Sequence, residues 1–199
     1  MLSHKFFLIN VLIFSFLHAC KPKELSKVFL SDSSKDYFSI QNNSNYTYTS
    51  FNDTNIQVNF KVSNFYTTFS NPDITNNEFI TYDLTSNEFP IKFTFKIESG
   101  PTQFKDRITL ISKKNDSLFI GPSLFNLNGN FDLSKNSKDS LSILPAKKFN
   151  NTTYDDVIRI KLFEHPMFNE IYYAKFKGLI AFSDKKGIIY YAIKTEIIN

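Results

Sequence analysis

Few side chains in this chain could perform covalent or acid–base chemistry. The 199-residue sequence holds one cysteine, Cys20, and three histidines, of which His165 alone lies beyond residue 20. A serine or cysteine nucleophile activated by histidine would therefore have to use His165. That residue stands in the polar sequence Glu164-His165-Pro166. This setting favours a loop histidine over a catalytic one.

Metal ligands and acid–base pairs are equally scarce. One imidazole and one thiol fall short of the four ligands of a zinc site. Asp132, Asn136 and Asp139 could offer oxygens to Ca²⁺, but their spacing lacks the regular ligand pattern of a calcium loop. Asp155 and Asp156 adjoin an expected strand start, where adjacent side chains point to opposite faces and do not converge. We expect no catalytic residue, no metal and no cofactor, so the chain is predicted not to be an enzyme.

Two tyrosine pairs are the best candidates for a ligand surface. Tyr172 and Tyr173, and likewise Tyr190 and Tyr191, are expected on the two arms of the last hairpin. Because strand side chains alternate between faces, one member of each pair should face inward and one outward. Outward tyrosines could form a stacking surface for a glycan or peptide. The alternative is ordinary core packing and cross-strand pairing.

The N-terminus has the layout of a secretory signal peptide. Lys5 supplies positive charge, residues 6–17 form a nearly unbroken apolar run, and small Ala19 precedes Cys20. As a helix this run would span roughly 18 Å, against a hydrocarbon core of about 30 Å. It is too short for a stable transmembrane helix. We therefore predict that residues 1–19 are a helical signal peptide, cleaved between Ala19 and Cys20.

The end of this segment, Leu17-His18-Ala19-Cys20, resembles a bacterial lipobox. The resemblance implies that Cys20 becomes the first mature residue and carries a diacylglyceryl thioether and an amide-linked acyl chain. Two or more chains hold a protein on a membrane almost permanently. The alternative is an ordinary cleaved signal with an incidental cysteine.

Two later stretches resemble uncharacterised envelope lipoproteins of the Bacteroidota. Tyr37-Phe38-Ser39-Ile40, followed by Tyr46-Thr47-Tyr48, is similar to the aromatic strands with which those proteins often begin. Residues 172–180, a turn at 183–187 and a strand over 188–197 are similar to their usual end. The resemblance implies an envelope β-domain and brings no catalytic residues.

The residues after Cys20 bear on location. Lys21-Pro22-Lys23-Glu24 is mostly basic, whereas surface-exported lipoproteins of that phylum resemble one another in acidic residues there. No aspartate follows the cysteine, where enterobacterial lipoproteins carry their retention signal. We expect a cell-envelope protein, lipid-anchored in the outer membrane and facing the periplasm.

The charge balance argues against nucleic acid as a partner. The sequence has 23 Lys and Arg against 19 Asp and Glu, and removal of residues 1–19 leaves a net charge of +3. No run of five basic residues occurs.

Cys20 has no second cysteine to pair with, so packing must hold the fold together.

The mature sequence predicts an all-β fold, mostly antiparallel. Apolar residues alternate with polar ones in several segments, among them 56–63 and 89–98, and turn signals such as Asn128-Gly129 separate them. We expect a curved sheet, a sandwich or a partly open barrel, with a short helical turn near residues 122–127 as the one helical candidate. The predicted units are a signal peptide (1–19), a lipidated tether (20–34) and a single β-rich domain (35–199).

These features favour a non-enzymatic envelope lipoprotein that binds a partner protein or an apolar ligand. The second hypothesis is a glycan- or surface-binding lipoprotein that uses exposed tyrosines, and the third is a periplasmic hydrolase built on carboxylates. A continuous cavity lined by Phe and Ile would favour the apolar ligand, and an exposed row of tyrosines the glycan. A hydrolase needs two carboxylates that converge in a cleft.

Overall fold

A computed structural model describes residues 26–37, 40, 42–70, 76–89, 92–100, 106–114, 117–127, 130–133 and 138–197. The expected signal peptide, the lipobox and Cys20 lie outside these residues. Within them, no helix is long and apolar enough to cross a membrane.

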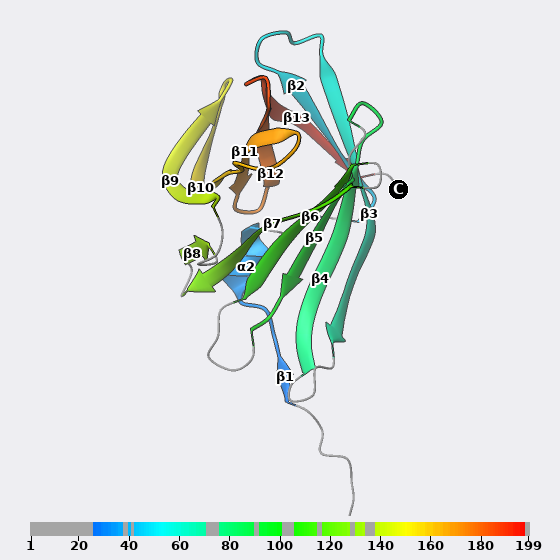
Figure 1. The fold of residues 1–199 in the computed structure, drawn as a ribbon, viewed down its shortest axis with the longest axis vertical. Helices are drawn as coiled ribbons and strands as arrows, with labels where there is room; N and C mark the ends of the chain where they lie inside the picture. The colour runs from blue at the N-terminus through cyan, green and yellow to red at the C-terminus, as the bar shows by residue number, and fades with distance from the viewer. Residues whose placement is uncertain are drawn as a thin grey trace, which may run out of the picture.

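One large sheet accounts for nearly all the described chain (Figure 1). Every strand pair is antiparallel except β1 with β4, so the prediction of a mostly antiparallel all-β fold is confirmed. The elements are β1 (Lys27–Val28), α2 (Asp32–Tyr37), β2 (Ser44–Ser50), β3 (Gln57–Ser70), β4 (Asn76–Thr85), β5 (Lys92–Glu98), β6 (Arg107–Lys114), β7 (Ser117–Leu127), β8 (Asn130–Leu133), β9 (Ser140–Phe149), β10 (Thr152–Lys161), β11 (Phe168–Ala174), β12 (Gly178–Asp184) and β13 (Ile189–Ile197).

The sheet consists of two meanders joined at the middle. Strands β2 to β8 follow one another in sequence order on one side, and β13 back to β9 on the other. The junction is the pairing of β2 with β13. Strands β8 and β9, at the two ends of the sheet, approach each other. Of the shapes expected, the partly open barrel is closest to this nearly closed arrangement.

The strand alternation places large apolar side chains inside the barrel. Val58, Phe60 and Val62 on β3 are buried while Asn59 and Lys61 between them are exposed. The same period buries alternate residues of β5, because side chains two apart share a face. The result is one main core with many aromatic rings.

The segment expected to be a lipidated tether packs on the domain where it is described. Leu30 is buried, and its N–H donates to a carboxylate oxygen of Glu78 over 2.8 Å. Strand β1 adds a short parallel pairing to β4. Residues 27–30 of the predicted tether thus pack against β4.

Helix α2 is a second departure from expectation. The Oγ of Ser31 accepts the N–H of Ser34 over 3.3 Å, the usual hydrogen bond at a helix start. Tyr37 at its end meets Phe131 edge-to-face at 5.0 Å between ring centroids. Six residues are too few to show a helical period in the sequence. The helical turn expected near residues 122–127 is instead part of β7.

The β9–β10 hairpin leaves the sheet halfway along its length. Its ladder is interrupted at Pro145 and Asp156, where Asp156 has a φ of 49°. Proline has no N–H to donate, so a bend here costs little pairing. Strand β10 pairs with β11 from Ile158 onward, and its first half does not. The hairpin tip is thus free to lie against the outer face of β11, β12 and β13.

Candidate functional site

A second apolar cluster covers this outer face. Strand β12 is buried on both faces, because Phe182 belongs to the main core and Ile180 to the outer cluster. The hairpin tip contributes Phe149, whose ring meets Tyr172 at 5.1 Å between centroids. The full set of buried residues is Phe149, Val157, Tyr172, Ala174, Ile180, Ala181 and Tyr191.

The structure separates the four candidate tyrosines by face. Tyr173 and Tyr190 lie in the main core, and Tyr172 and Tyr191 in the outer cluster. They stand on β11 and β13, with β12 between them, and not on the arms of one hairpin. All four are at most 6% exposed, so they do not form the exposed row that would favour a glycan, and the alternative of core packing describes them. The hairpin tip covers the outward members, which the local pattern could not indicate.

Tyr172 is held by its own polar network. Its hydroxyl donates to Glu170, which also pairs with Arg159. Burial, together with the hydrogen bond to Glu170, raises the pKa of Tyr172 to about 12. This phenol is therefore engaged inside the fold.

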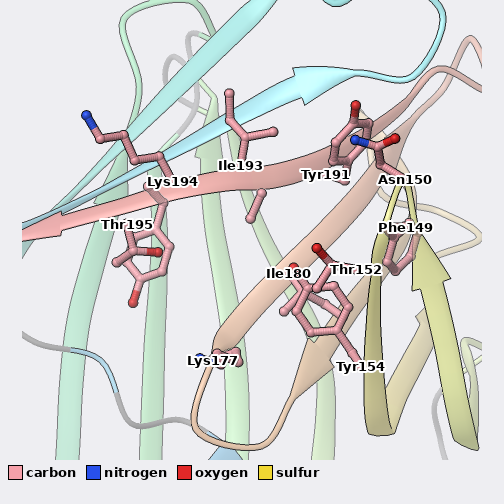
Figure 2. A pocket seen from close by; sticks show the side chains of 12 residues that line it. Phe149, Asn150, Thr152, Tyr154, Lys177, Ile180, Tyr191, Ile193, Lys194 and Thr195 are labelled. Carbon is pink, nitrogen blue, oxygen red and sulfur yellow. The ribbon is translucent and has the colours of Figure 1, made fainter.

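Tyr191 differs, because it borders a hollow of about 370 Å³ (Figure 2). Ligand sites of this kind typically measure about 300–1,000 Å³. Figure 2 shows side chains of the β9–β10 hairpin on one side and side chains of β13 on the other. The lining residues are Tyr46, Phe149, Asn150, Thr152, Tyr154, Lys177, Ile180, Tyr191, Ala192, Ile193, Lys194 and Thr195.

Irregular backbone shapes each wall of the hollow. On β13, Ala192 pairs with Tyr48 and Lys194 with Thr47, which leaves Ile193 as a bulge. A bulge redirects side chains, and Ile193 is 49% exposed at the rim. Opposite it, the bend at Pro145 and Asp156 brings the hairpin tip over the sheet. The turn that carries Lys177 ends at Gly178, whose φ is 71°.

Several polar groups around the hollow are available for a ligand. The hydroxyls of Tyr154 and Tyr191 make no hydrogen bond within the described chain. The same holds for the side chains of Asn150, Thr152 and Thr195. Tyr46 is partly engaged, since its hydroxyl bonds to Ser44. Five side chains with unused hydrogen-bonding capacity therefore line one hollow.

His165 lies in the core and not in an exposed loop. Its Nδ1 accepts the backbone N–H groups of Met167 and Phe168, over 3.2 and 3.1 Å. The neutral ring therefore carries its proton on Nε2, which donates to Ser112 Oγ over 2.9 Å. A catalytic histidine needs the opposite polarity, because its Nε2 must accept the serine proton. The arrangement fixes the segment between β10 and β11, and burial, with the nearby charge of Lys185, lowers the pKa of His165 to about 4.

The remaining chemical candidates do not come together. Among the residues that the structure describes, no three His, Cys, Asp or Glu side chains are grouped to hold a metal. Asp139 accepts the N–H of Phe163 over 2.9 Å, and Asn136 lies outside the described residues. Asp156 pairs with Lys175 at 3.6 Å.

The void described between the core rings is too small for an apolar ligand. The void between the core rings measures about 10 Å³, roughly the space of one water molecule. It is lined by Phe60, Phe93, Phe95, Leu110, Phe168, Ile171, Tyr173, Leu179 and Phe182.

The hollow combines ring faces with free donors and acceptors. This mixture suits a small ligand that has both apolar faces and hydroxyl or amide groups at its edge. Comparisons of the chain with protein-family models, curated proteins and solved structures found no match.

Proposed function

We propose that this chain is a lipid-anchored, non-enzymatic envelope lipoprotein that binds a saccharide in the hollow between β13 and the β9–β10 hairpin. Cys20 would carry the lipid, in the outer membrane and facing the periplasm. The supporting observation is the set of unused polar side chains around phenol rings in one hollow.

The chemistry of a sugar matches that lining. A pyranose ring presents C–H groups on its faces, which pack against aromatic rings, and hydroxyls around its edge. The half-buried Tyr154 offers both ring surface and a hydrogen-bonding tip, and Tyr191, whose ring is buried, borders the hollow with its hydroxyl unused. Asn150 and Thr152, at the hairpin turn, supply an amide and a hydroxyl next to them.

Binding without hydrolysis fits the absence of acidic groups from the lining. Glycosidases cleave with two carboxylates that flank the bond, separated by about 5–9.5 Å. None of the lining side chains is an aspartate or glutamate.

A partner protein is the second candidate. Phe51 is 62% exposed and its ring lies 6.4 Å from that of Tyr191, so an apolar rim adjoins the hollow. Exposed aromatic residues next to a depression are typical of protein contacts.

The lipid anchor makes the first testable prediction. Cys20→Ala should abolish labelling of the protein by radioactive palmitate in growing cells. Alanine has no sulfur atom, so the lipid thioether cannot form. The control is Lys21→Ala, which keeps the cysteine and should label normally. Labelling of the Cys20→Ala variant at the wild-type level would show that the lipobox interpretation is wrong.

The saccharide site makes the second prediction. An array of defined oligosaccharides would select a bound sugar, and calorimetry would then measure its Kd. Tyr154→Ala should raise that Kd by about ten-fold, because a lost hydrogen bond and ring contact together are worth about 1.4 kcal/mol. Tyr154 is half-buried, so its removal spares the main core.

The matched control is Tyr66→Ala, an exposed tyrosine on β3 that does not line the hollow. Its Kd should equal that of the wild type. Equal loss in both variants, or none in Tyr154→Ala, would exclude the hollow as the saccharide site.

A further inference from the structure

The charge around the hollow is one-sided. Lys177 enters its lining from the turn between β11 and β12, and Lys194 from β13. Lys147 on β9 does not line the hollow, but its Nζ lies 5.7 Å from the centre of the Phe149 ring, which does. The lining thus holds two lysines, from two elements, and no carboxylate.

Two acidic groups on the same elements, Glu196 on β13 and Asp156 on β10, are each paired with a lysine. Glu196 forms an ion pair with Lys194, and both side chains are more than half exposed. Asp156 is paired with Lys175, which does not line the hollow. The side chain of Lys177 has neither an ion pair nor a hydrogen bond within the described residues.

We infer that the saccharide of this hollow bears a negatively charged group, and that Lys177 binds it. The inference rests on the proposed saccharide function and names the class of sugar. Lys194 is the second contact, since its pair with Glu196 is exposed, weak in water and easily exchanged for a ligand anion.

Lysine recognises charge more than shape. Its ammonium is a compact point charge on a flexible stem, whereas the planar guanidinium of arginine selects bidentate partners. No arginine lines the hollow. A carboxylate, as in a uronic acid, and a phosphate, as in a sugar phosphate, therefore share the chemistry that Lys177 would bind.

The test compares charged and neutral sugars on the full mature protein in detergent. The probes are galacturonic acid trisaccharide, galactose trisaccharide of the same length, and galactose 1-phosphate beside free galactose. We expect at least ten-fold tighter binding of the charged member of one pair, with an advantage that shrinks between 50 and 300 mM NaCl. The pair in which it appears identifies carboxylate or phosphate as the group.

Substitutions of Lys177 test whether this residue causes the preference for the charged probe. Lys177→Gln should lower the affinity for the charged probe to that for the neutral one and leave neutral binding unchanged. Lys177→Arg keeps the charge and should retain most of the preference. Lys186→Gln is the control, because it removes one exposed lysine, and the same net charge, outside the hollow.

Different results would exclude the negatively charged group and the saccharide site. Charged and neutral probes bound with equal affinity, or an equal loss in Lys177→Gln and Lys186→Gln, would overturn the inference and leave a neutral saccharide site. Absence of binding by all four probes would overturn the inference. If the oligosaccharide array is also negative, the proposed function falls as well.

Discussion

Replacing Phe182 with alanine should lower the free energy of unfolding by about 3–5 kcal/mol. Phe182 is 1% exposed, and its ring lies 5.0–5.8 Å from those of Tyr48, Phe60, Phe168 and Tyr190. Alanine would leave a cavity among rings that come from four other strands. Because domains are stable by about 5–15 kcal/mol in total, this is a large fraction.

Urea unfolding followed by far-UV circular dichroism would measure the change. Phe176→Ala is the control, since that phenylalanine is 66% exposed in the turn between β11 and β12. It should change stability by less than about 0.5 kcal/mol. A loss below about 1 kcal/mol for Phe182→Ala would mean that β12 is not the centre of the core.

His165 should make the folded state sensitive to mild acid. Its pKa is about 4 in the folded chain, against an ordinary value of 6.5. Below pH 6.5 the unfolded chain therefore binds a proton that the folded chain refuses, so stability is complete above pH 6.5 and falls as the pH drops toward 4. At about 1.36 kcal/mol per pKa unit, the loss is about 3 kcal/mol.

A substitution isolates this titration from that of the carboxyl groups. In His165→Asn the side-chain oxygen can still accept the backbone N–H groups, but the site no longer titrates. Asp83 titrates in both proteins: burial raises its pKa, and hydrogen bonds from Lys92 and Thr94 lower it overall. The difference in urea midpoint between wild type and variant should thus change across pH 4–6.5. A constant difference would show that His165 does not control the acid response.

The strands could be predicted from the sequence because the alternation of apolar and polar residues is a local pattern. The alternation of Val58, Phe60 and Val62 specifies a face whatever the neighbouring strand is. The sequence does not say which strands become neighbours, so the pairing of β2 with β13 that nearly closes the barrel could not be deduced. The expectation that His165 lies in a loop was wrong for a related reason. It was based on the polar sequence around the residue, whereas the ring stacks on Phe93 at 6.2 Å between centroids.

The candidate site was recovered in part. Of the nominated tyrosines, Tyr191 borders the hollow and the other three pack within the fold. Phe149, Asn150 and Tyr154 were missed, although Asn150-Asn151 is a turn signal between two strands. That signal predicts a hairpin, but it does not predict that the hairpin tip folds back over the sheet.

Pro145 in β9 also affects whether two copies of the protein can pair through their sheet edges. Strand β9 ends the sheet, so its outer edge has no strand partner among the residues that the structure describes. Exposed edges recruit strands from other copies, and natural proteins prevent this with proline and lysine. Pro145 cannot donate a hydrogen bond, and Lys147 and Lys148 would bring like charges together. Under the proposed lipid anchor, which would concentrate the protein in two dimensions, these residues should keep neighbouring copies from joining edge to edge into aggregates.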